Sequence, residues 1–301
     1  MKTDESFARM RIDGGTRLFA VFGHPIAHTF SPKIHELFIG ERGGNMAYIA
    51  CHVEPERIGE AIRGAWAMEI AGINLTIPHK ETSIPFLCGI SDNARRVGAV
   101  NTLKRTENGY FGYNTDVYGM QKQLQTGGMH LEGRSVLLLG AGGAARSALA
   151  VCQLEGAKEV RVYNRHRERA EALIASYMSN TEGEERPLMR AVTLEEAVGE
   201  PHPYVIQTTP AGMHGTQNPL PIEDERFYEG IGYAADAVYR PQDTPFLQRV
   251  RRAGGIGVEG LAMLFYQGAR SFEIWNGFTY TEETREALKE KFLAWAKEYF
   301  A

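Results

Sequence analysis

The sequence predicts an α/β fold built as two domains. The first indication is an apolar run at residues 136–139, which breaks into a glycine-rich turn and is followed by a helix of small residues at 144–154. The second is another predicted strand, at 159–163, which follows that helix. The third is length, because 301 residues are many for one domain and comfortable for two.

The glycine-rich turn has the residues of a phosphate-binding loop. Gly140 and Gly142 allow the backbone to turn sharply and to approach a ligand closely, and Ala145 stands where a third glycine or an alanine is allowed. The turn opens a helix, whose first N–H groups bind a pyrophosphate. We therefore expect a dinucleotide cofactor here. A methyl-donor cofactor and a tight glycine turn in another kind of α/β protein are the alternatives.

The residues after the second strand favour NADP over NAD. NAD sites place an Asp or a Glu here to bind the ribose 2′-hydroxyl, whereas this chain has Asn164, Arg165 and, four residues on, Arg169. A guanidinium forms two parallel hydrogen bonds with a 2′-phosphate, which a carboxylate would repel. Arg165 is the first candidate to bind the 2′-phosphate, because it lies at the strand end, and Arg169 is the second. Arg167 and Glu168 are expected to be ordinary solvated helix residues.

The composition is that of a globular protein with neither a nucleic-acid nor a membrane partner. The chain is 43% hydrophobic and 23% charged, and its net charge of −4 disfavours nucleic acid. Residues 1–17 lack the apolar segment of a signal peptide, and no apolar run is long enough to span a membrane. Three separated cysteines, Cys51, Cys88 and Cys152, indicate a reducing compartment and buried thiols. The cytoplasm is the expected location.

Strands and helices alternate on both sides of the glycine-rich turn, as in layered α/β domains. On the N-terminal side the pattern predicts strands at 18–22, 46–53 and 70–75, helices at 32–39, 55–68 and 117–125, a helical turn at 92–96, and a hairpin of 100–103 with 110–113 around an Asn-Gly turn. On the C-terminal side it predicts strands at 204–207, 233–238 and 254–258 and helices at 261–275 and 281–299. These last two helices are expected to fold back onto the first domain, and residues 179–186 to form a surface loop.

Three polar clusters in the N-terminal half are candidates for the chemistry. In the first, the hydroxyls of Thr29 and Ser31 stand beside a helix start, where free N–H groups favour a carboxylate. By spacing alone, Ser31 is expected to be the N-cap of that helix. A metal site of His24, His28 and His35 is not expected, because prolines break the helical register and no carboxylate is interleaved.

The other two clusters offer a lysine and an aspartate. Lys80 closes a polar segment that follows a strand, and Asp116 follows Asn114 and Thr115 at a helix start. Together they could give and take the proton when hydride transfer converts a carbonyl into an alcohol. Spacing alone does not prove this, because most lysines are solvated and an Asp before a helix is often its cap.

A series of motifs, in order from Leu18 to about Gly277, resembles the shikimate dehydrogenase family. The motifs are Gly23-His24-Pro25-Ile26-Ala27-His28-Thr29-Phe30-Ser31-Pro32, Asn74-x-Thr76-x-Pro78-x-Lys80, Gly98-Ala99-Val100-Asn101-Thr102, Asn114-Thr115-Asp116, Gly140-Ala141-Gly142-Gly143-Ala144, Asn164-Arg165, Asp236-x-x-Tyr239-x-Pro241 and Met263-Leu264-x-x-Gln267. The resemblance implies a substrate domain of residues 1–118 and 260–301 and an NADP-binding Rossmann domain of residues 119–259. It also implies reversible, NADPH-dependent reduction of 3-dehydroshikimate to shikimate, on the route to chorismate and the aromatic amino acids.

Carried over by motif, the resemblance gives individual residues a role. Lys80 and Asp116 would be the proton-transfer pair. The substrate carboxylate would be bound by Thr29 and Ser31, with Tyr239 nearby, and the ring hydroxyls by Thr76, Asn101 and Gln267. The residues that would bind NADP are Gly140, Ala141, Gly142, Gly143, Ala144, Asn164, Arg165, Arg169, Ala237 and Gly260. No metal is expected, and a homodimer is an open option for the assembly.

The chain departs from the family pattern at four positions. Thr29 replaces a Ser that is frequent in the family, which leaves the exact substrate open. His166 replaces a frequent Thr, which makes the predicted preference for NADP over NAD less sharp. Val117 and Glu259 replace a common Gly and a common Asp. The alternatives are a quinate/shikimate dehydrogenase using NAD or NADP, the more distant methylenetetrahydrofolate dehydrogenases, and an NADP-binding sensor without turnover, which the proton-transfer pair disfavours.

Overall fold

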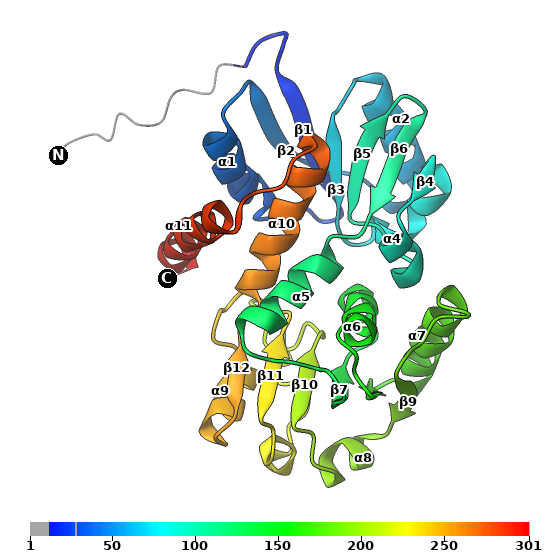
Figure 1. Ribbon diagram of the computed structural model, residues 1–301, viewed down its shortest axis with the longest axis vertical. Helices are drawn as coiled ribbons and strands as arrows, with labels where there is room; N and C mark the ends of the chain where they lie inside the picture. Colours follow the sequence, from blue (N-terminus) through cyan, green and yellow to red (C-terminus); the bar gives the residue numbers. More distant parts are fainter. Residues whose placement is uncertain (1–11, 28, 301) are drawn as a thin grey trace, which may run out of the picture. The chain divides into compact units, whose positions relative to one another are not determined.

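The computed structural model of the protein describes residues 12–27 and 29–300, which divide into two compact units (Figure 1). The first unit contains the described residues up to Ile90, with Val100–Tyr113 and Ser271–Leu288. The second contains Ser91–Ala99, Asn114–Arg270 and the described residues from Lys289 onward. His28 of the first motif and residues 1–11 of the N-terminal segment lie outside the described residues. Within the described ranges, no helix has the length and apolar content needed to cross a membrane.

The first unit is built on a mixed six-stranded sheet with the order β2-β1-β3-β5-β6-β4. β1 (Arg17–Gly23) pairs in parallel with β2 (Met46–His52) and β3 (Gly72–Leu75). β5 (Thr102–Thr106) and β6 (Gly109–Tyr113) form the hairpin that the Asn-Gly turn predicts, and β4 (Gly89–Ile90) lies at the edge. Its helical elements are α1 (Ser31–Arg42), η1 (Pro55–Arg57), α2 (Ile58–Ala67), α3 (His79–Thr82), η2 (Ile84–Phe86) and the parts of α10 (Leu261–Asn276) and α11 (Glu282–Phe300) that fall within Ser271–Leu288.

An aromatic core packs against this sheet. Phe19 of β1 stacks on Trp275 with ring centroids 5.0 Å apart, and the indole N–H of Trp275 donates to the carbonyl of Leu103. The end of α10 therefore returns to the first sheet, as the expected fold requires. In the same core His35 stacks on Tyr48 at 4.1 Å, and burial lowers the pKa of His35 to about 3. His35 is thus a neutral core residue.

The second unit is a Rossmann sheet of six parallel strands. The strands are β7 (Ser135–Leu139), β8 (Glu159–Tyr163), β9 (Leu188–Val192), β10 (Tyr204–Gln207), β11 (Tyr233–Asp236) and β12 (Ile256–Val258). Their order is β12-β11-β10-β7-β8-β9, so the direction of winding reverses between β7 and β10. Ligands of such sheets bind beyond the carboxyl ends of the strands at this reversal.

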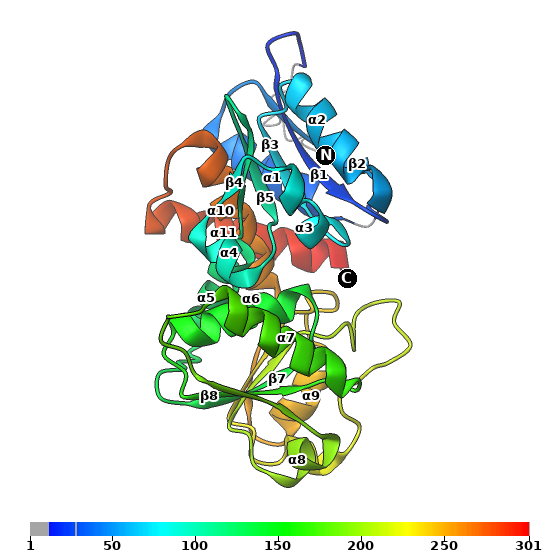
Figure 2. The ribbon, with the colours of Figure 1, turned by 90° about the vertical axis from the view of Figure 1, so that its right-hand side faces the viewer.

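Helices cover both faces of the second sheet, because its strands bury both of their faces. Val136 and Leu138 of β7 point to one face, and Leu137 and Leu139 point to the other. The first face is covered by α5 (Asp116–Thr126), α6 (Gly143–Leu154) and α7 (Arg167–Asn180), and α4 (Asp92–Val97) adds Val97 to this core (Figure 2). The second face is covered by α8 (Leu194–Gly199), η3 (Glu225–Tyr228) and α9 (Pro245–Arg252).

Several local expectations are wrong. Helix α1 begins at Ser31, its N-cap is Phe30, and no side chain caps it, so Ser31 does not have the predicted capping role. Helix α7 extends to Asn180, and Thr181 is buried with its hydroxyl bonded to the carbonyl of Tyr177, so residues 179–186 are only in part a surface loop. Among the free cysteines Cys152 is buried as expected, but Cys88 is exposed and Cys51 is half-buried.

Candidate active site

The glycine-rich turn lies at the reversal point of the second sheet. Gly140 follows β7 with a φ of 111°, and a Cβ at this position would lie 2.6 Å from the hydroxyl oxygen of Thr208, beyond β10. Only glycine fits this backbone and this contact. Gly142 is the extended N-cap of α6, and no capping side chain occupies the first N–H groups of that helix. Ala145 is fully buried, which lets α6 pack closely on the sheet.

A cavity of ≈ 1390 Å³ adjoins this turn within the second unit. Its size suits a dinucleotide, and its walls come from the ends of β7, β8 and β10. The predicted cofactor residues that line it are Gly140, Ala141, Gly142, Asn164, Arg165 and Arg169. The cradle at Gly140 and the helix N-terminus fit a pyrophosphate.

Two arginines at the end of β8 are available for a phosphate. Arg165 and Arg169 are exposed, and no described side chain forms a hydrogen bond or an ion pair with either guanidinium. By contrast, Arg167 is paired with Glu171 at 2.9 Å, as an ordinary helix residue. Asn164 accepts a hydrogen bond from the backbone N–H of His166 at 2.9 Å, which shapes the turn after β8.

Four other predicted cofactor residues do not line this cavity. Gly143 and Ala144 form the first turn of α6. Ala237 donates its N–H to the carbonyl of Gln207, and a Cβ on Gly260 would lie 2.5 Å from the carbonyl of Val238. Gly260 therefore allows its backbone to lie close to the backbone of Val238.

The sequence interpretation missed part of the cavity wall. Thr208 and Thr209 follow β10 and line the cavity beside the glycine-rich turn, and Asn218 lines it further along the chain. The signal for the two threonines was present, because they directly follow a strand that adjoins β7 in a Rossmann sheet. Nothing in the sequence around Asn218 places it there.

In the first unit, Thr29 and Ser31 form one hydroxyl cluster. The Thr29 hydroxyl donates to the Ser31 hydroxyl at 3.2 Å, and the Ser31 N–H donates back to the Thr29 oxygen at 3.3 Å. Tyr48 lies against this cluster, because its phenol interacts with Ser31 and also donates to Asn74 Oδ1 at 2.8 Å. Burial raises the pKa of Tyr48 well above its ordinary value, so it remains a neutral hydrogen-bonding group.

Backbone hydrogen bonds place Thr76, Lys80 and Asn101 near one another beyond the end of β3. The N–H of Leu75 donates to the carbonyl of Asn101 at 2.9 Å, and the N–H of Val100 donates to the carbonyl of Lys80 at 2.8 Å. Asn101 is 2% exposed, whereas Thr76 and Lys80 are half-buried. These three predicted substrate and proton-transfer residues thus neighbour one another at the end of β3.

In the second unit, Asp116 and Gln267 lie on neighbouring helices. Asp116 is the first residue of α5, and a Cβ on Gly119, one turn later, would lie 2.9 Å from the Cβ of Gln267 on α10. The backbone N–H of Val117 is capped by the side chain of Asn114 at 3.3 Å. The capping role that made Asp116 ambiguous is therefore filled by Asn114. Asp116 is 6% exposed.

Tyr239, the remaining predicted residue, follows β11 in the second unit and is half-buried. Burial raises its pKa, with a smaller opposing effect of Arg240. Its phenol is thus neutral at physiological pH and suited to hydrogen bonding.

Comparisons with known proteins match three parts of the chain to one family. Residues 21–103 match the shikimate dehydrogenase substrate binding domain, residues 121–197 match shikimate/quinate 5-dehydrogenase, and residues 260–289 match the shikimate 5′-dehydrogenase C-terminal domain. A protein of Thermosynechococcus vestitus named shikimate dehydrogenase (NADP(+)) is 39% identical over 272 residues, which are 89% of this chain and 92% of that protein.

Solved structures give the same result. The shikimate dehydrogenase of Aquifex aeolicus has a TM-score of 0.81 and 31% identity, covering 94% of this chain and 99% of that chain. The shikimate 5-dehydrogenase of Thermus thermophilus, solved with NADP(H) and shikimate, has a TM-score of 0.78 and 33% identity, covering 92% and 100%. The order of the motifs, the Rossmann topology and identity above 30% along nearly the whole chain agree, and the chain belongs to the shikimate dehydrogenase family.

Proposed function

We propose that this protein catalyses the reversible, NADPH-dependent reduction of 3-dehydroshikimate to shikimate. The observation that carries the proposal is the similarity, over most of the chain, to relatives named shikimate dehydrogenase (NADP(+)). The phosphate-binding turn and the two unpaired arginines of the second unit add physical support, because they suit a dinucleotide with a 2′-phosphate.

Recognition of the substrate is assigned to residues that the family motifs carry over. The Thr29 and Ser31 hydroxyls are donors for its carboxylate, and Thr76, Asn101 and Gln267 are hydrogen-bonding partners for its ring hydroxyls. Lys80 and Asp116 are the proposed pair that gives or takes the proton at the carbonyl oxygen. NADPH, when bound, supplies the hydride.

The cofactor is held by the second unit in this proposal. The N–H groups at the start of α6 and the Gly140 turn receive the pyrophosphate, and Arg165 with Arg169 receives the 2′-phosphate. Gly143, Ala144, Ala237 and Gly260 are further proposed cofactor residues, carried over from the family motifs. A carboxylate that would repel a 2′-phosphate is absent from the four residues after β8, Asn164 to Arg167.

Shikimate is the proposed substrate in preference to quinate, because Thr29 narrows the carboxylate end of the pocket. We also propose residues 1–118 with 260–301 and residues 119–259 as the functional domains. The proposed compartment is the cytoplasm, to which the free thiols are suited, and the proposed partners are the small-molecule substrate and a second copy of the chain, with no nucleic acid.

A steady-state assay of the purified protein tests the proposal. Shikimate and quinate are each supplied with NADP and with NAD, and reduction of the cofactor is followed by absorbance. We expect the highest kcat/KM for shikimate with NADP. Higher values for quinate, or for NAD, would favour the quinate/shikimate alternative. No turnover with any of the four pairs, together with NADPH binding, would favour the sensor alternative.

A further inference from the structure

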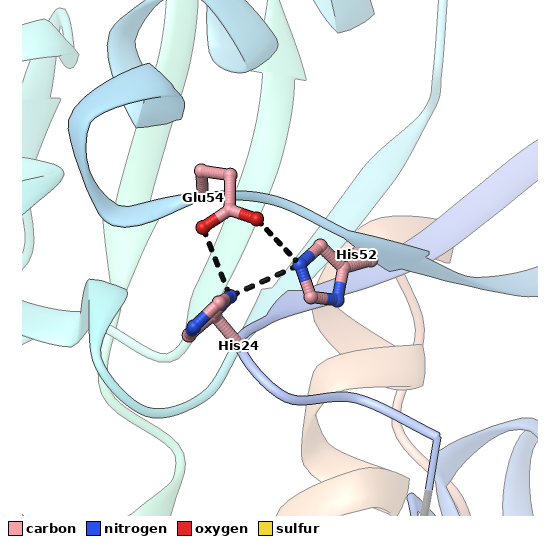
Figure 3. Close-up of side chains that lie close together, drawn as sticks. All are labelled: His24, His52 and Glu54. Carbon is pink, nitrogen blue, oxygen red and sulfur yellow. Dashed lines mark hydrogen bonds and ion pairs between the residues drawn. The ribbon is translucent and has the colours of Figure 1, made fainter.

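Three side chains that commonly bind metals meet at one edge of the first sheet (Figure 3). β1 and β2 run in parallel with Gly23 opposite His52, so His24 leaves β1 beside the end of β2. Glu54 follows His52 by two residues, before η1. Figure 3 shows both imidazoles and the carboxylate pointing toward one another. This cluster is not used by the function proposed above.

The spacing of the three groups is that of ligands around a small cation. His24 Nδ1 lies 3.0 Å from His52 Nε2 and 3.3 Å from Glu54 Oε2, and His52 Nε2 lies 3.1 Å from Glu54 Oε1. Around a tetrahedral zinc ion with bonds of about 2.0–2.1 Å, neighbouring ligand atoms are about 3.3–3.4 Å apart. The two nitrogens and one ligand oxygen of Glu54 lie within 4.8 Å of one another, so small shifts of the side chains let the three groups share one ion.

Protons alone do not satisfy this arrangement. If only one of the facing nitrogens is protonated, it can donate to both neighbours, but the other nitrogen then faces the carboxylate with a lone pair against a lone pair. If both are protonated, their N–H groups oppose each other across 3.0 Å. With Glu54 ionised, each of these arrangements leaves one of the three contacts repulsive. A cation attracts all three atoms at once.

The donor set and its exposure indicate which cation fits. Two imidazole nitrogens and one carboxylate suit Zn²⁺ and similar first-row ions, whereas Ca²⁺ and Mg²⁺ prefer oxygen ligands. His24, His52 and Glu54 are 37%, 50% and 52% exposed, so an ion can enter and water can take a fourth position. Three protein ligands with one open position is the usual composition of an accessible zinc site.

We propose that His24, His52 and Glu54 bind one divalent transition-metal ion, for which Zn²⁺ is the best-suited candidate. The ion ties the segment after β1 to the end of β2. That segment carries Thr29 and Ser31, so a bound ion stabilises the loop that presents these hydroxyls.

Direct binding measurements on the full chain, without a histidine tag, test the site. After treatment with EDTA and its removal, ZnCl₂ is titrated by calorimetry, and CoCl₂ is titrated while visible absorbance reports tetrahedral coordination. We expect one ion per chain. His52→Ala and Glu54→Gln should each weaken zinc binding by at least about 10–100-fold, a loss that even changes outside the ligand set can cause. Zinc should also raise the thermal unfolding midpoint of the wild type more than that of either variant.

Two matched variants identify non-specific binding. His130→Ala removes an exposed histidine of the second unit, and Cys51→Ser removes a thiol whose side chain points away from that of His52 on β2. Both should bind zinc as the wild type does. The proposal is wrong if the wild type binds no stoichiometric zinc at micromolar concentration, or if binding survives both ligand substitutions. Because Glu54 is half exposed, Glu54→Gln keeps the test decisive even where His52→Ala does not fold.

Discussion

The hydroxyl of Thr244 donates a hydrogen bond of 2.7 Å to the carboxylate of Asp236, and both residues are fully buried in the second unit. The second carboxylate oxygen of Asp236 accepts from the N–H of Val238 at 2.9 Å. Thr244 is also the N-cap of α9, so this bond fixes the start of that helix to the end of β11. Burial raises the pKa of Asp236 to about 7, against the lowering effect of these two hydrogen bonds.

The raised pKa of Asp236 predicts a particular dependence of stability on pH. The folded state holds the proton up to about pH 7, whereas the unfolded chain releases it near the ordinary value for Asp. This contribution to stability is therefore complete below about pH 4 and is lost as the pH rises through about 7, with a slope of at most about 1.4 kcal/mol per pH unit. Asp236→Asn keeps the shape and cannot titrate. Urea unfolding at pH 5 and pH 8 should show a larger loss of stability in the wild type than in the variant, and equal losses would contradict the assignment.

Lys80→Ala should lower kcat by about 10²-fold or more, the scale of general acid–base catalysis. NADPH binding should persist, because Lys80 is not among the residues that line the cofactor cavity. Lys158→Ala, at an exposed lysine of the second unit, is the control and should keep normal turnover. Near-normal kcat in folded Lys80→Ala protein would remove Lys80 from the mechanism.

Substitutions of Asp116 and Asn114 should distinguish a catalytic role from a helix-capping role. Asp116→Asn should lower kcat with little loss of stability, because the side chain of Asn114 caps the N–H of Val117. Asn114→Ala should cost about 1–2 kcal/mol of stability, since it removes this cap and a bond to the carbonyl of Ala99. Steady-state kinetics and denaturant unfolding of both variants provide the comparison. A stability loss in Asp116→Asn equal to that in Asn114→Ala would return Asp116 to a structural role.

Arg165→Ala should weaken NADPH binding by about 1–3 kcal/mol, the range of charge-assisted hydrogen bonds. NADH has no 2′-phosphate and should bind almost as before. Arg167→Ala is the matched control, because Arg167 is already paired with Glu171. Fluorescence titration with both cofactors measures the difference, and equal losses for NADPH and NADH would mean that Arg165 is structural.

The sequence predicts the Rossmann unit well because its signals are local. The strand at 136–139, the Gly140 turn and the small-residue helix follow one another, and each agrees with the buried, parallel arrangement that the structure contains. β9 is not predicted, because it is an edge strand with Arg190 at its centre, and the short α8 and α9 carry too few periods to stand out.

Contacts between distant segments account for the other differences. Ser31 has a typical capping residue type, but the turn before α1 bonds it to Thr29 instead. The sequence argument about metals compared His24 with its neighbours in the chain, whereas the structure places it beside His52 and Glu54 of the next strand. The cluster depends on the register of β1 with β2, which pairs Gly23 with His52 and which the sequence alone does not give.

The last prediction concerns the choice between shikimate and quinate at Thr29. Quinate has a hydroxyl on the carbon that bears the carboxylate, where shikimate has a planar alkene carbon, so its pocket must admit extra bulk and another polar group. The Thr29 hydroxyl is already bonded to Ser31 at 3.2 Å, and its methyl group takes room that a serine would leave. A misfit of about 1–3 kcal/mol corresponds to roughly 10–200-fold discrimination.

We therefore expect shikimate to be preferred over quinate in kcat/KM, and Thr29→Gly to reduce the difference between the two kcat/KM values. Thr29→Ser, which removes only the methyl group, should narrow it while keeping the bond to Ser31. Comparable kcat/KM values for the two substrates in the wild type would show that Thr29 does not exclude quinate.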